Sequence, residues 1–167
     1  MNTLALTKIP YGMFIISSAF DGKIGAQVAN TVFQINSDPA TLAISISKQN
    51  NTHNLLSDSK KAVISTLTED ASFEFIGNFG FRSSRDFDKF ASIEYKLNSD
   101  GIPIVTNFIN SYFETEIVSQ FETTTHTIFL CKVLNCEVLN DNATMTYSYY
   151  HKVKKGLTPK NAPTFIK

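Results

Sequence analysis

Short strand-like runs of apolar and β-branched residues recur along this chain, and turn residues separate them at intervals of about ten. The runs expected to form strands are 11–20, 26–35, 41–47, 62–68, 109–121 and 125–139. In 41–47, Leu42, Ile44 and Ile46 alternate with small or polar residues, as in a strand that buries one face. The DGK at 21–23 is a hairpin signal between the first two runs. Because strands joined by short turns pair antiparallel, the sequence predicts a mainly β, antiparallel barrel.

Short helices are expected beside this barrel. One is expected to follow a cap at Asn51 or Thr52 and to run to about residue 58. The clearest helix spans 70–80, because apolar residues recur at every third position between a cap at Asp70 and a stop at Gly80. The remaining expected elements are a loop with a short helix at 83–92, an extended piece at 101–105 and one more strand at 145–153.

Composition excludes several classes of protein. Lys and Arg number 15, and so do Asp and Glu, so no net charge attracts nucleic acid or an anionic membrane. No run approaches the ~18 apolar residues of a membrane span. The first residues, MNTLALTKIPYGMF, lack the pattern of a signal peptide. We therefore expect a single-domain cytoplasmic protein without nucleic-acid or membrane partners.

The two cysteines, Cys131 and Cys136, lie five residues apart on one expected strand. That odd spacing sends their side chains to opposite faces, which excludes a mutual disulfide. No CxxC pair is present, which argues against a zinc ribbon or a rubredoxin-type iron centre within this sequence. The histidines form no ligand spacing either, so no metal site is expected.

The stretch SISKQNNTHNLL, residues 45–56, joins a strand end to a helix start. Such a junction collects free backbone N–H groups and the positive end of the helix dipole. The Ser47 and Thr52 hydroxyls, the Asn51 amide and the Lys48 ammonium would complete a cradle for a phosphate. The alternative is that these are ordinary capping and loop residues, since caps favour the same residue types.

Two further candidates are weaker by themselves. FGFRSSRDFDKF, residues 79–90, gathers Arg85 and Lys89, and Asp86 can orient the arginine, although a solvated loop explains these charges equally well. His126 stands at the start of a strand, in step with Ile128 and Leu130. A single histidine in such a position is more often a packed residue than a catalytic one.

These motifs occur in an order that resembles a known family. A hairpin, then ANTVFQ, SISKQNNTH, FGFRSSRDFDKF, THTIFLCKV and the tail YYHKVKKGLTPKNAPT are together similar to the flavin reductase-like family. The likeness covers nearly the whole chain and is greatest to the flavoprotein part of high-molecular-weight rubredoxins and to flavoredoxin. The resemblance implies one FMN-binding domain over 1–167, folded as a split β-barrel that forms a homodimer.

The resemblance also implies roles for particular residues. The ANTVFQ strand lies along the isoalloxazine in this family, SISKQNNTH reaches the ribityl chain and phosphate, and the RSSRD loop with its following lysine adds further contacts. The implied flavin contacts are therefore Gln27, Ala29, Asn30, Thr31, Ser45, Ile46, Ser47, Lys48, Asn51, Thr52, Ser83, Ser84, Arg85, Asp86 and Lys89. His126 matches a histidine that borders the nicotinamide side of the flavin, which makes it the catalytic candidate.

The function that follows is an oxidoreductase that takes electrons from NADH or NADPH through FMN. The acceptor is expected to be separate, because the sequence lacks cysteines for a rubredoxin centre. Candidate acceptors are a rubredoxin, a flavodiiron-type protein, a ferric complex or free flavin. The alternatives are an FMN electron carrier without its own nicotinamide site and, less favoured by the neutral charge, a barrel that binds single-stranded nucleic acid.

Overall fold

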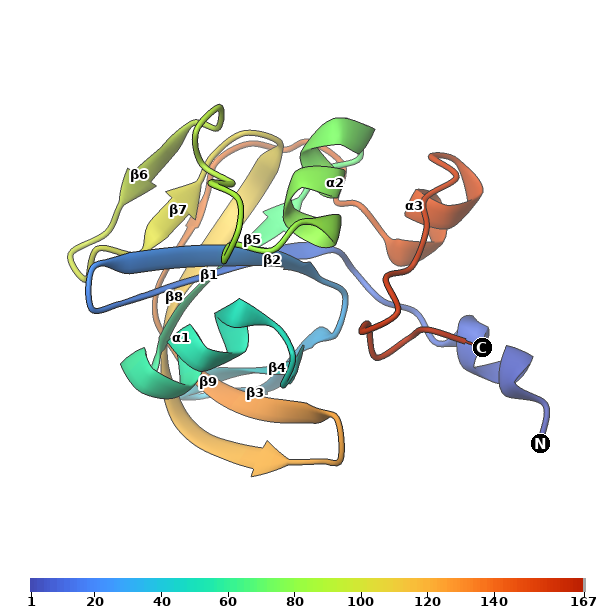
Figure 1. The fold of residues 1–167 in the computed structure, drawn as a ribbon, viewed down its shortest axis with the longest axis horizontal. Coiled ribbons are helices and arrows are strands. Elements are labelled where there is room, and N and C mark those ends of the chain that lie inside the picture. Colours follow the sequence, from blue (N-terminus) through green and yellow to red (C-terminus); the bar gives the residue numbers. More distant parts are fainter. Residues whose placement is uncertain (167) are drawn as a thin grey trace.

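The computed structural model, which describes residues 1–166, contains a seven-stranded antiparallel sheet with the strand order β2-β1-β5-β8-β9-β4-β3 (Figure 1). Two short strands, β6 and β7, form a separate hairpin. The elements are η1 (Thr3–Lys8), β1 (Phe14–Phe20), β2 (Lys23–Ala29), β3 (Val32–Ser37), β4 (Ala40–Ser47), α1 (Asn51–Ser59), β5 (Lys61–Leu67), α2 (Phe73–Phe81), β6 (Tyr95–Leu97), β7 (Pro103–Val105), β8 (Ile109–Glu122), β9 (His126–Val138) and α3 (Tyr147–Lys152). The mainly antiparallel β prediction is confirmed.

The first hairpin forms where the sequence predicts it. Asp21 and Gly22 have φ values of 50° and 71°, so both central residues of the turn are left-handed. This turn matches the twist of paired strands and fixes the register of β1 against β2, from Phe20 opposite Lys23 to Phe14 opposite Ala29. As a result β2 lies at one edge of the sheet.

The expected strand at 26–35 is in fact two strands. β2 ends at Ala29 and β3 begins at Val32, and these two strands occupy opposite ends of the sheet order. Thr31 holds this crossing to the sheet, because its carbonyl accepts a hydrogen bond of 3.1 Å from the Ser45 N–H. The break therefore brings the end of β2 and the end of β4 near the same part of the molecule.

Two other predictions were wrong. The segment 145–153 contains the helix α3 rather than a strand, because Thr146 caps it through the Tyr149 N–H. The segment 83–92 contains turns and no helix. There the Ser83 and Asp88 side chains accept from nearby backbone N–H groups, which competes with helical hydrogen bonding. The short helix η1 has no counterpart among the predicted elements.

The helix ends also differ from the predicted ones. α2 is capped by Ser72, whose hydroxyl accepts from the Phe75 N–H at 3.1 Å, whereas Asp70 accepts from the Thr68 hydroxyl. It ends at Phe81 rather than at Gly80. α1 begins after Asn50, one residue earlier than expected.

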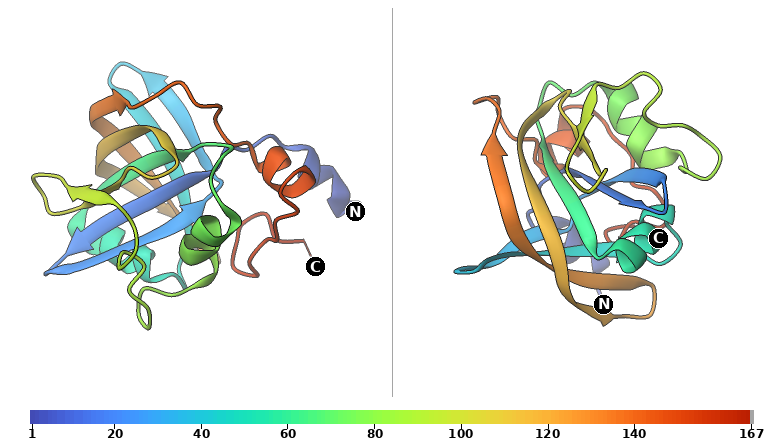
Figure 2. Two further views of the ribbon diagram at one scale, coloured as in Figure 1. Left: turned by 90° about the horizontal axis from the view of Figure 1, so that it is seen from above. Right: turned by 90° about the vertical axis from the view of Figure 1, so that its left-hand side faces the viewer.

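The core lies on both faces of the sheet. One cluster places Phe75, Ile76 and Phe79 of α2 against β1 and β2, and another buries Leu56 of α1 among strand residues. Both helices therefore lie close to β2, and the C-terminal segment returns to the same region (Figures 1 and 2). A cavity lies between them.

Both cysteines are free: Cys131 is buried and Cys136 is exposed, as their odd spacing predicts. Within residues 1–166, no helix is long and apolar enough to cross a membrane. The same residues include no group of three or more His, Cys, Asp or Glu side chains that could hold a metal ion.

Candidate functional site

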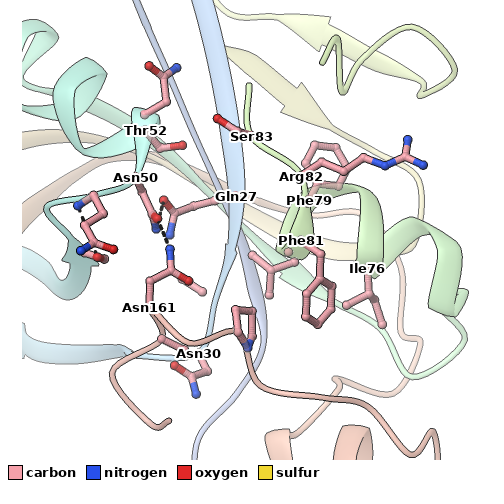
Figure 3. Close-up of a pocket in the computed structure, with 18 of the residues that line it drawn as sticks. Gln27, Asn30, Asn50, Thr52, Ile76, Phe79, Phe81, Arg82, Ser83 and Asn161 are labelled. Carbon is pink, nitrogen blue, oxygen red and sulfur yellow. Dashed lines mark hydrogen bonds between the residues drawn. The ribbon is translucent and has the colours of Figure 1, made fainter. Parts of the chain in front are cut away.

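A cavity of about 530 Å³ opens between β2, α1, the end of α2 and the C-terminal segment (Figure 3). This volume lies within the roughly 300–1,000 Å³ of small-molecule sites. Polar groups from α1 and from the loop after α2 line one end, and apolar and aromatic side chains from α2 and α3 line the other. The cavity can therefore hold a ligand with an anionic end and a flat, partly apolar end.

Most of the residues assigned by resemblance come together at this cavity. Those that line it are Gln27, Ala29, Asn30, Ser45, Ser47, Asn51, Thr52, Ser83, Ser84, Arg85, Asp86 and Lys89. Ile46 is instead a fully buried core residue. Lys48 pairs with Glu122 at 3.0 Å, and neither it nor Thr31 lines the cavity.

The first turn of α1 is open to a ligand. Asn50 occupies the N-cap position, but its side chain makes no capping hydrogen bond. The His53 N–H donates to the Asn50 carbonyl at 3.1 Å. The N–H groups of Asn51 and Thr52, at the first two positions of the helix, remain available to an anion. Gly25 packs closely beside them, since a Cβ there would lie 2.7 Å from Leu55 Cδ1.

Lys89 adds a buried positive charge to the lining of the cavity. Its side chain is 4% exposed, and its Nζ donates to the carbonyls of Ala26 at 2.8 Å and Phe79 at 3.1 Å. Burial lowers its pKa from 10.5 to about 8. Among the described residues no carboxylate lies within ion-pair distance of it. A buried ammonium without a counter-ion favours an anionic ligand. We call Ser47, Asn51, Thr52 and Lys89 the anion end.

Positive side chains predominate around the cavity although the chain as a whole is neutral. Arg82, Arg85, Lys89 and Lys160 line it, against the single carboxylate of Asp86. The Arg82 guanidinium lies 4.2 Å from the centre of the Phe87 ring, a cation–π contact. This local excess of positive charge supports an anionic ligand.

A third wall was not predicted as part of the site. Residues 157–164, which we call the C-terminal strap, border the cavity opposite α2. Its residues are half-buried or exposed, so the segment lies along the surface of its own chain. Asn161 donates to the Asn50 side chain, and Asn30 donates to Thr164 Oγ1 at 2.8 Å. The Tyr150 hydroxyl also donates to the Leu157 carbonyl.

Asn50 was also missed, although it stands within SISKQNNTH. Its Nδ2 donates to Gln27 Oε1 at 3.0 Å while its Oδ1 accepts from Asn161 (Figure 3). It therefore connects the strand β2, the helix α1 and the C-terminal strap. Nothing in the local sequence separates it from a normal helix cap, because its partners lie far away along the chain.

His126 lies beside the cavity without lining it. It is the first residue of β9, opposite Ser47 of β4, and its Nδ1 lies 2.8 Å from the Thr125 hydroxyl. Its Nε2 is buried without a hydrogen-bond partner. Burial lowers its pKa, and the Asn161 backbone partly opposes that effect. The C-terminal strap thus lies close to this ring.

Known proteins are similar to this chain in sequence and in fold. A model of the family described as "Flavin reductase like domain" matches residues 6–158. The chain is 46% identical over 165 residues to a protein of Moorella thermoacetica named high molecular weight rubredoxin, covering 99% of this chain and 72% of that one. It is 40% identical over 166 residues to a ferric-chelate reductase (NAD(P)H) of Archaeoglobus fulgidus, covering 99% and 98%.

A solved structure, an FMN-binding protein of Thermus thermophilus with bound p-hydroxybenzaldehyde, shares the fold. Its TM-score is 0.71 at 18% identity, over 79% of this chain and 74% of that one. At this identity the likeness concerns the arrangement of the backbone.

Proposed function

The chain belongs to the flavin reductase-like domain family, as its motifs predict, and from this premise we propose that residues 1–167 form one FMN-binding oxidoreductase domain. It takes electrons from NADH or NADPH and passes them to an acceptor outside the printed sequence. The observation that carries the proposal is Lys89, a buried ammonium that forms no ion pair among the described residues. It donates to the Ala26 carbonyl, and the Cβ position of the adjacent Gly25 lies 3.6 Å from Asn51 Nδ2 in the uncapped first turn of α1. Both features suit the phosphate of FMN.

The proposed contacts follow the two ends of the cavity. The anion end, with Ser83 and Arg85, holds the phosphate through charge-assisted hydrogen bonds, each worth roughly 1.5–3 kcal/mol. Gln27, which is bonded to the N-cap residue Asn50, and Asn30, which is bonded to Thr164, present amide groups to the rest of the cavity. A flat ring with hydrogen-bonding edges fits between these polar groups and the aromatic wall. When bound, the isoalloxazine supplies the capacity to accept a hydride and release electrons. The protein binds it, orients it and limits water access.

The likeness to the relatives supports the donor and the class of acceptor. The ferric-chelate reductase (NAD(P)H) matches over nearly its whole length, which favours a nicotinamide donor and a ferric acceptor. The high molecular weight rubredoxin favours a rubredoxin, or a flavodiiron-type protein, as the acceptor. His126, beside the cavity, is proposed to border the nicotinamide.

A homodimer is part of this proposal. The outward face of β3, β4, β8 and β9 exposes Phe33, Ile35 and Phe121, with exposed fractions of 55%, 47% and 67%. Helix η1 buries no residue of its own and exposes Leu4 and Leu6. Apolar surface of this kind suits an interface. A split barrel completed by a second copy would cover it.

Anaerobic stopped-flow mixing tests the function. The FMN-loaded protein is mixed with NADH or NADPH while flavin absorbance near its visible maximum is followed. The proposal expects bleaching that saturates with nicotinamide concentration and is much faster than for free FMN. The alternative, an electron carrier without a nicotinamide site, predicts a flavin that stays oxidised with both donors. Adding ferric chelate or a rubredoxin to the reduced protein then ranks the acceptors by reoxidation rate.

A further inference from the structure

The Asn50 side chain can either cap helix α1 or hold the C-terminal strap, and these two contacts compete. At an N-cap, an Asn carbonyl normally accepts from an N–H group of the first helical turn. In the structure, that oxygen accepts from Asn161 instead, and the amide nitrogen donates to Gln27 (Figure 3). Helix α1 therefore has no side-chain cap. The contact to the C-terminal strap is made in place of the cap.

The distal part of the C-terminal strap has few other attachments. Beyond residue 158, its side-chain hydrogen bonds to the rest of the described chain are those of Asn161 to Asn50 and of Thr164 to Asn30 and Tyr147. Its backbone–backbone hydrogen bonds run within the segment, as from Ala162 to Pro159, and the Asn161 backbone also lies close to His126. Asn50 therefore supplies one of only a few points that fix this wall of the cavity.

An anion at the first turn of α1 changes the balance between these two uses. Without the anion, turning Asn50 toward the strap leaves the Thr52 N–H without a side-chain acceptor, which favours a capping rotamer. With the anion bound, that N–H group is satisfied by the ligand, so Asn50 is free to hold Asn161. A ligand that binds one of two states better shifts the equilibrium toward that state.

We propose that Asn50 is a positioning residue that latches the C-terminal strap over the cavity when an anion occupies the anion end. The inference rests on the proposed function, because FMN is the anion considered. The latch makes phosphate binding and strap closure reciprocal: FMN stabilises the closed strap, and the closed strap slows FMN release. Flavin binding and flavin residence time then depend on different residues.

The variant that tests this is Asn50→Ser. Serine is a good N-cap residue, so α1 stays stable, but its short side chain reaches neither Gln27 nor Asn161. Asn161→Ala removes the same latch from the strap side. The matched control is Asn135→Ser on β9, where the amide donates only to Glu114 at 2.8 Å and is exposed.

Two measurements are made on each protein. Strap opening is followed by limited trypsin cleavage at the Lys160–Asn161 bond, which requires the segment to leave the surface, with mass spectrometry of the released piece. FMN release is followed by the fluorescence of freed flavin. In the unaltered protein and in Asn135→Ser, FMN is expected to slow the cleavage.

In Asn50→Ser and Asn161→Ala, this protection is expected to be largely lost and FMN to leave roughly two- to tenfold faster, the range of one hydrogen bond. The double variant is expected to be no worse than either single one, because both remove the same contact. Normal release and protection in Asn50→Ser, or additive effects in the double variant, overturn the latch while leaving FMN binding intact. Failure of the unaltered protein to bind FMN overturns both the latch and the proposed function.

Discussion

The anion end and the C-terminal strap, two parts of the cavity lining, are held in different ways. At the anion end, Ser47 is the last residue of β4 and pairs with β9, and Thr52 lies on a helix packed against β1. The Lys89 ammonium is held by hydrogen bonds to two backbone carbonyls. The C-terminal strap has no strand or helix of its own and is held by scattered side-chain contacts. A preformed end suits affinity, and a loosely held end suits entry and release. Substitutions at the anion end should therefore change the affinity for FMN, and substitutions that affect the strap should change the rate of FMN release.

The largest effect is expected from Lys89→Met, which keeps the buried stem and removes the charge. Loss of one charge-assisted contact of about 1.5–3 kcal/mol weakens FMN binding by roughly 10- to 150-fold. Titration with FMN, followed by quenching of its fluorescence, measures this. Affinity within threefold of the unaltered protein would show that the anion end does not hold the phosphate.

The pH dependence of FMN affinity also tests whether the charge of Lys89 holds the phosphate. The pKa of Lys89 is lowered to about 8 by burial, and a nearby phosphate favours its protonated form. FMN affinity is therefore expected to be constant below pH 8 and to fall above it, by at most tenfold per pH unit. Titrations between pH 7 and 9.5 check this, and Lys89→Met should remove the slope.

Stability of the flavin-free protein should move in the opposite direction. The folded-state pKa of Lys89 lies below its ordinary value of 10.5, so the unfolded chain binds more protons between pH 8 and 10.5. The contribution of Lys89 to the free energy of unfolding therefore rises through that range. Denaturant titrations of the unaltered protein and of Lys89→Met give this contribution by difference. No difference in slope would contradict the buried, charged state.

Gly156→Ala should disturb the strap end with a smaller effect on affinity. A Cβ at Gly156 would lie 2.0 Å from Tyr150 Cζ, and the ring cannot move away without losing its contact to Leu157. Overpacking of this kind costs about 1–3 kcal/mol, and FMN should leave faster at nearly unchanged association rate. Gly77→Ala is the control, since nothing lies within 4 Å of its added Cβ. Equal melting temperatures for the two variants would contradict this packing.

The smallest effect is expected from Lys48→Met. Lys48 was assigned to the flavin by resemblance, but its ammonium pairs with Glu122. An exposed pair of this kind contributes about 0–1 kcal/mol to stability. FMN affinity should stay within about twofold, in contrast to Lys89→Met. A tenfold loss would place Lys48 at the phosphate after all.

The anion end and the C-terminal strap also differ in how well the sequence predicts them. The strand alternation before Ser47 and the helix start after it are local patterns, and they lead directly to the anion end. The tyrosines of 145–153 favour a strand, but Thr146 caps a helix there, so the strand prediction was wrong. The Asn50–Asn161 contact joins residues 111 positions apart, so no local pattern could indicate it. The strap segment also has no apolar periodicity to place it against a surface.

The central claim is that this cavity binds FMN, and the visible absorption spectrum tests it most directly. The purified protein is mixed with excess FMN and passed through gel filtration beside the Lys89→Met variant. The account predicts flavin bands that elute with the unaltered protein at about one FMN per chain, and much less flavin with the variant. A colourless protein peak at micromolar concentration, or equal flavin in both proteins, would contradict it.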